Sequence, residues 1–130
     1  MKPAAAWKAL MKFAAAKPGA WEDHPWGETT FKVGKKGFVF FGHRDYGYSL
    51  TCKLPDSSEA ATTMFSWAEP TGYGLGNSGW VTARFETSQD VPVDLLREWI
   101  DESYTAVAPK RGLKEVSPAR KPAAKRRKRA

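Results

Sequence analysis

Several short stretches of this chain alternate apolar with polar residues, and this period of two constrains the fold more than any other feature. Residues 29–33 follow the pattern, and it recurs over 48–54 and 80–86. Such alternation places one face of a β-strand in a core and the other in water. Together with an apolar run at 38–41, these stretches predict an antiparallel sheet with one buried face.

Other segments carry the period of an amphipathic helix, with apolar residues every three or four positions. One such stripe runs over 7–14 and stops at the Lys-Pro-Gly sequence 17–19, and another runs over 92–107. A middle helix is expected after Asp56, which can cap it, with Glu59 three residues later reaching back to the start. The chain therefore has three predicted helices.

Glycine and proline mark the connections between these elements. The segment 21–28 reads as a loop, and the glycine-rich segment 69–79 is expected to hold a short strand at 73–75. The elements then follow the order α-β-β-β-α-β-β-α. This order predicts an α+β domain with two layers, α-β(3)-α-β(2)-α, in which the helices cover one face of a single antiparallel sheet.

Positive charge is concentrated at the C-terminus. The 130 residues include 21 Lys and Arg and 14 Asp and Glu, a net charge of +7. Residues 109–130 hold ten of the basic residues and one acid, a net charge of +9, so residues 1–108 carry −2. The tail has no aromatic residue, and we expect it to be disordered because it cannot bury enough apolar surface. We therefore divide the chain into a domain, 1–108, and a basic tail, 109–130.

The residue types that most often carry chemistry are few. Cys52 shares a strand face with Leu50 and Leu54, which is typical of a core thiol rather than a nucleophile. His24 has carboxylates nearby, but their spacing matches no common metal site. We expect no enzyme activity, no metal and no cofactor.

The sequence also bears on location. It contains no apolar run of membrane-spanning length, and Lys8 and Lys12 interrupt the N-terminal segment where a signal peptide would be apolar. A single cysteine excludes an intrachain disulfide and is typical of a reducing compartment. We expect a monomer in the cytoplasm, without membrane contact.

The strand pattern predicts which side chains face away from the helices. If the helices cover Phe31, Leu50, Cys52, Val81 and Phe85, basic and aromatic residues occupy the open face. Such a face can bind phosphates and stack bases, or it can bind a partner protein. A third interpretation has Trp80 packed under a loop and the charges solvated. The expected open-face residues are Lys32, Thr51, Lys53, Trp80, Thr82 and Arg84, with Phe41 as a further member.

The turn between the first two expected strands is basic. Lys32, Lys35 and Lys36 lie on or near the tip of this hairpin. A basic hairpin can act as a wing against a DNA backbone, although a solvated turn is the common alternative.

Five segments, in order over about residues 5–108, resemble the MmcQ/YjbR family of small bacterial proteins: PWGETTFKV, GFVFF, LTCKLP, GYGLGNSGWVTARF and LLREWIDESYTAV. The most specific features are Lys53, the pair Gly79 and Trp80, and the pair Ser103 and Tyr104. The resemblance implies a secretion-chaperone-like fold, and it implies DNA binding through a proposed double wing of hairpins. Because chaperones of this fold class bind proteins, a protein-binding adaptor is the alternative function.

These observations predict a DNA-binding protein that is largely indifferent to sequence. The tail looks like the basic arm of nucleoid-associated proteins and can bind phosphates without reading bases. The residues expected to contact nucleic acid are Lys32, Lys35, Lys36, Lys53, Trp80 and Arg84 in the domain and Lys125, Arg126, Arg127, Lys128 and Arg129 in the tail.

Overall fold

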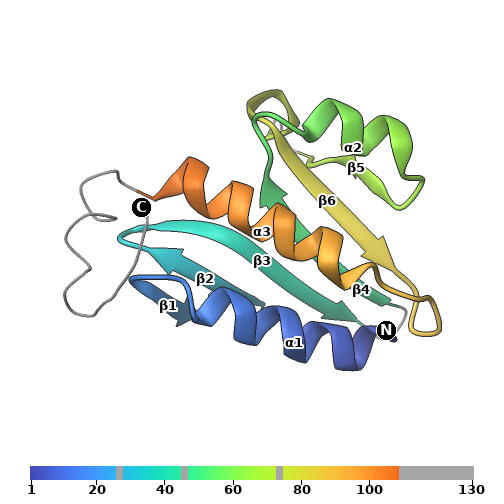
Figure 1. Ribbon diagram of the computed structural model, residues 1–130, viewed down its shortest axis with the longest axis horizontal. Coiled ribbons are helices and arrows are strands. Elements are labelled where there is room, and N and C mark those ends of the chain that lie inside the picture. The colour runs from blue at the N-terminus through green and yellow to red at the C-terminus, as the bar shows by residue number, and fades with distance from the viewer. Residues whose placement is uncertain (26–27, 45–46, 73–74, 109–130) are drawn as a thin grey trace.

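A six-stranded antiparallel sheet lies at the centre of the protein, with three α-helices on one of its faces in the described residues (Figure 1). The computed structural model describes residues 1–25, 28–44, 47–72 and 75–108. In chain order the elements are α1 (Pro3–Ala15), β1 (Ala20–Asp23), β2 (Thr29–Val33), β3 (Lys36–Arg44), β4 (Gly47–Lys53), α2 (Ser58–Met64), β5 (Ala68–Pro70), the 3₁₀ helix η2 (Leu75–Ser78), β6 (Trp80–Phe85) and α3 (Val93–Val107).

The strands lie in the order β1-β2-β3-β4-β6-β5. Figure 1 shows α1 and α3 crossing in front of the sheet, with α2 beside β5 and β6. The predicted α+β class with an open antiparallel sheet is therefore confirmed. Within the described ranges, no helix is both long and apolar enough to cross a membrane.

The core lies between the helices and the sheet. Leu10 of α1 and Leu96 and Ile100 of α3 are completely buried, as the helical stripes predict. Trp7 of α1 makes edge contacts with aromatic rings of β3, β4 and β6. Burying one large apolar side chain contributes about 1.5–3 kcal/mol, so the helices are held to the sheet mainly by this apolar contact.

Strand β1 overlaps the segment that the sequence predicted as a loop, so that prediction is wrong for residues 21–23. Gly19 turns the chain back from α1 with a φ of 76°, a value that glycine adopts without strain. Residues 20–23 then pair with β2, from Ala20 opposite Val33 to Asp23 opposite Thr30. The segment lacks buried alternation because it is an edge strand, and the free edge of β2 supplies its hydrogen bonds.

The short strand of the glycine-rich segment also lies elsewhere. Residues 73–74 are outside the described residues, and Leu75 begins η2 rather than ending a strand. The strand that pairs with β6 is β5, with Ala68 opposite Ala83. Sequence periodicity could not locate it because three residues are too short to show alternation.

The cap of α2 differs from the prediction as well. Neither Asp56 nor Glu59 caps the helix, which begins after Ser57 without a side-chain capping bond. Instead, Glu102 of α3 accepts the backbone N–H groups of Asp56 and Ser57, at 2.9 and 3.1 Å, and the Ser57 hydroxyl at 2.6 Å. A carboxylate from a distant helix therefore accepts hydrogen bonds from the backbone N–H groups just before α2.

We expect Glu102→Ala to lower the free energy of unfolding by about 1–2 kcal/mol, the range found when a capping side chain is removed. Urea denaturation measures the loss. Glu98→Ala, an exposed change on the same helix, is the control and should cost less than about 0.5 kcal/mol. Equal losses in the two variants would contradict a capping role for Glu102.

Candidate nucleic-acid interface

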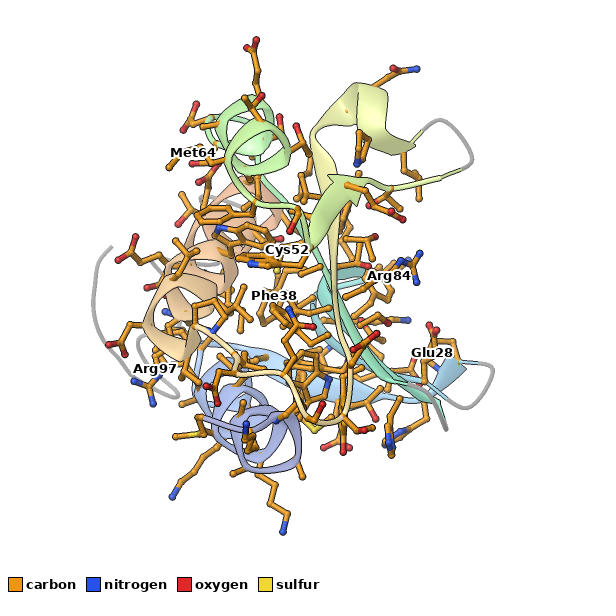
Figure 2. The ribbon with its side chains drawn as sticks, turned by 90° about the vertical axis from the view of Figure 1, so that its right-hand side faces the viewer. Glu28, Phe38, Cys52, Met64, Arg84 and Arg97 are labelled. Carbon is orange, nitrogen blue, oxygen red and sulfur yellow. The ribbon has the colours of Figure 1, made fainter. Side chains whose placement is uncertain are left out.

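In the described part of the chain, no α-helix covers the face of the sheet opposite α1 and α3, although Thr30 and Thr82 on that face are buried. Figure 2 shows Phe38 and Cys52 between the helices and the sheet, while Arg84 and Glu28 project on the other side. Burial completely removes Cys52 from water and raises the pKa of its thiol, which makes it a core residue and not a nucleophile. The basic and aromatic residues predicted to bind a ligand are sought on the open face.

A β-bulge in β3 decides which aromatic residues reach the open face. Phe31 pairs with Val39, but Lys32 pairs with Gly37, so Phe38 is an extra residue in the ladder. Phe38 and Val39 are both fully buried, and the alternation is inverted from there on. Phe40 consequently lies on the open face.

Phe41, which the sequence predicted on the open face, instead belongs to the core. Its side chain is 2% exposed and its ring lies 6.1 Å from that of Trp7. Phe40 takes its place on the open face, where its ring meets that of Trp80 at 5.8 Å and an interplanar angle of 61°. The bulge is the physical reason, because one extra residue exchanges the faces of all the residues that follow it.

Ser103 anchors the bulge from α3. Its buried hydroxyl donates to the carbonyl of Phe38, the extra residue, and accepts the backbone N–H of Lys53 at 2.8 Å. Both groups lie where the ladder between β3 and β4 ends. One side chain on the helix layer therefore fixes the backbone beneath Phe40 and Lys53.

At this end of the sheet, tryptophan and lysine residues line up across four strands. Trp21 pairs with Lys32, and Lys53 pairs with Trp80. Between the two lysines lies Gly37, and a Cβ atom there would come within 2.8 Å of the Phe40 ring. We call Trp21, Lys32, Lys53 and Trp80 the basic row.

The charges of the basic row are only partly neutralised. The Lys32 amine lies 2.7 Å from a carboxylate oxygen of Asp23 and 5.2 Å from the centre of the Trp21 ring. The hydrogen bond from Lys32, more than that from the backbone of His24, lowers the pKa of Asp23. Among the described residues, no carboxylate lies within 4.0 Å of Lys35, Lys36 or Lys53.

Lys35 and Lys36 add positive charge beside this end of the face. Both are exposed: Lys35 lies in the turn between β2 and β3, and Lys36 is the first residue of β3, next to Gly37. The structure thus brings three of the six predicted domain residues, Lys32, Lys53 and Trp80, to one end of the open face, with Lys35 in the adjoining turn. Lys36 pairs with the core residue Val33, so its strand position is on the helix side of the sheet.

Arg84 does not join them. It pairs with Ser49, four residues along β4 from Lys53, which is a separation of about 13 Å at the usual rise of a strand. Its guanidinium Nε lies 3.1 Å from a carboxylate oxygen of Glu69. A hollow of about 480 Å³ adjoins this ion pair, and its lining includes Gly42 and Trp67. This end of the face is therefore charge-balanced.

Threonine residues separate the two ends. The hydroxyl of Thr82 lies 2.9 Å from that of Thr51 and 3.0 Å from that of Thr71. Thr82 is 6% exposed, although its strand position faces away from the helices. These side chains satisfy one another and offer little charge to a ligand.

Sequence reasoning missed two residues of this surface, Trp21 and Phe40. Trp21 lay in a segment that was predicted to be a loop. Its indole N–H donates to the carbonyl of Gly34, thirteen residues away, and no local sequence pattern indicates this contact. The described residues contain no group of three histidine, cysteine or carboxylate side chains placed to share a metal ion. The predicted tail residues 125–129 lie outside the described residues.

Comparisons with known proteins agree with this architecture. A crystal structure of Deinococcus radiodurans protein DR2400, whose domain is described as DUF419, is 25% identical and superposes with a TM-score of 0.66, covering 84% of this chain and 86% of that one. A crystal structure of a Pseudomonas syringae protein shares the fold at 14% identity, with a TM-score of 0.58 and coverage of 77% and 97%. No curated protein matches the sequence. The YjbR family model matches residues 15–106, and the chain therefore belongs to the YjbR family.

Proposed function

We propose that this protein binds DNA through phosphate contacts, largely without reading sequence. The observation that carries the proposal is that Lys32 and Lys53 lie at one end of the sheet face opposite the helices, with Lys35 and Lys36 exposed in the hairpin beside them. Lysine amines attract phosphates as point charges and do not discriminate between bases. The tail, with its net charge of +9, would supply most of the affinity.

The electrostatics of the domain support a local site rather than a general attraction. Residues 1–108 carry a net charge of −2, so the domain as a whole does not draw DNA toward it. Because the net charge of the domain is negative, phosphates can bind it only where cations are not paired with carboxylates. Lys35, Lys36 and Lys53 meet this condition among the described residues.

The test compares two pairs of lysines in the full-length protein. Lys35→Gln with Lys36→Gln should flatten the dependence of log K on log salt by about 1.8, because each neutralised phosphate contributes about 0.9. Lys8→Gln with Lys12→Gln removes the same charge from the exposed side of α1 and should leave the slope unchanged. Anisotropy of a labelled duplex at several salt concentrations measures both. Equal slopes in the two double variants would reject the hairpin as a DNA contact.

A second candidate function is protein binding at the other end of the open face. The Arg84–Glu69 ion pair and the adjoining hollow of about 480 Å³ favour it, because a charge-balanced, partly aromatic depression suits a polypeptide better than a polyanion. Arg84→Glu should leave DNA affinity nearly unchanged if Lys53 and the hairpin carry the phosphates. A large loss of DNA affinity in this variant would extend the DNA site over the whole face.

A further inference from the structure

The basic row differs from an ordinary charged surface because aromatic rings flank its lysines. Trp21 is 46% exposed although it lies in a strand, and Trp80 packs edge-on against Phe40 on the open face. The core on the opposite face includes neither Trp21, Phe40 nor Trp80. These three rings are therefore available to form a separate aromatic surface.

The backbone of β3 determines where the Phe40 ring lies. The bulge at Phe38 turns Phe40 toward the open face, and Ser103 holds the bulge in place. The Phe40 ring lies directly over Gly37, where any side chain would collide with it. The absence of a side chain at Gly37 leaves room for the Phe40 ring.

The spacing of the row fits an extended strand of nucleic acid. Trp21 and Trp80 are separated by four strand-to-strand steps, about 19 Å at the usual spacing within a sheet. This width is several times the roughly 3.4 Å rise between neighbouring nucleotides of one stacked strand, so the row can contact more than one nucleotide. Lysines lie between the two aromatic ends, so a strand whose bases reach the rings can place phosphates of its sugar-phosphate backbone near them.

We propose that the basic row binds single-stranded DNA, with unpaired bases stacked on Trp80, Phe40 and Trp21 and phosphates held by Lys53, whereas Lys32 is already paired with Asp23. In a duplex the faces of the bases are already stacked, so rings on a flat sheet can engage only an unpaired strand. This inference rests on the proposed DNA-binding function and specifies the form of DNA that the folded domain selects.

The test measures two ligands with the full-length protein: an oligomer of about 20 thymidines and a duplex of the same length. Trp21→Ala and Trp80→Leu should each lower the affinity for the thymidine oligomer by about 5- to 150-fold, the range expected for losing one stacked base. Affinity for the duplex, which depends on charge, should change less than about twofold. Met64→Ala, which removes a side chain of 70% exposure from the helix layer, is the control and should change neither affinity.

Trp80 packs against Phe40, so its replacement can also disturb the fold; thermal unfolding of each variant checks this. Trp21 is exposed, and its variant tests the inference independently of Trp80. If Trp21→Ala and a folded Trp80→Leu bind the thymidine oligomer as the parent does, the inference is wrong even when the duplex still binds. If the parent binds neither ligand, the DNA-binding function itself fails.

Discussion

Replacing the five basic residues near the C-terminus by glutamine should weaken binding to a DNA duplex by at least about a hundredfold at low salt. Each phosphate that a cation neutralises adds about 0.9 to the slope of log K against log salt, so the slope should flatten by up to about 4.5. Anisotropy of a labelled duplex between about 50 and 200 mM salt measures it. The residues changed are Lys125, Arg126, Arg127, Lys128 and Arg129.

A charge-preserving variant is the control for this experiment. Changing Arg126, Arg127 and Arg129 to lysine keeps the net charge of the tail at +9 and should retain nearly all the affinity. This follows because non-specific attraction to phosphates depends on charge more than on the geometry of the cation. A glutamine variant with the slope of the parent would show that the tail does not contact DNA.

Ser103→Ala should destabilise the domain by about 2–5 kcal/mol, the largest stability effect that we predict for removing a single polar atom. The change leaves the Phe38 carbonyl and the Lys53 N–H without their partner in a buried site. An unsatisfied buried polar group costs about 1–3 kcal/mol, and here two groups lose their hydrogen bond. Urea denaturation, with the linear dependence on urea extrapolated to water, measures the change.

Thr105→Ala is the matched control, because it removes an exposed hydroxyl from the same helix. It should change the free energy of unfolding by less than about 0.5 kcal/mol. A comparably small effect of Ser103→Ala would mean that the bulge is stable without its anchor. Near-ultraviolet circular dichroism adds a second measurement, since a displaced bulge would alter the contact between Phe40 and Trp80.

The two predictions concern two parts of the chain with different roles in our proposal. In our proposal the tail contributes charge and therefore affinity, while the bulge and its anchor contribute the geometry of the basic row. The first effect should weaken steeply with salt, and the second should not, because a buried hydrogen bond is shielded from mobile ions. Salt dependence thus distinguishes the two contributions in one protein.

Much of the fold could be predicted because it depends on local patterns. The apolar stripe of α3 identified Trp99 as a core residue, and it is 3% exposed. Strict alternation placed Lys53 between the buried residues Cys52 and Leu54 and therefore on the open face. Helices and regular strands repeat at a known period, so the burial of one residue predicts that of its neighbours.

The errors occurred where that regularity is interrupted or where a partner is distant in the sequence. Strand β1 exists because the free edge of β2 offers hydrogen bonds, and four residues with two carboxylates carry no alternation of their own. The start of α2 is bound by Glu102, more than forty residues away. Neither partner can be identified from local propensity, because propensity describes only neighbours along the chain.

By itself, the sequence determined the α+β class, the three helices, the face of each regular strand and the concentration of positive charge in residues 109–130. These properties follow from periodicity and charge, which are local or additive. Only the tertiary structure decided that Phe40 rather than Phe41 reaches the open face, that Trp21 joins Lys32 there, and that Arg84 stands apart. The physical reason is the bulge at Phe38: a single extra residue reverses the alternation, and its stability comes from a hydroxyl on a helix that is sixty-five residues distant in the chain.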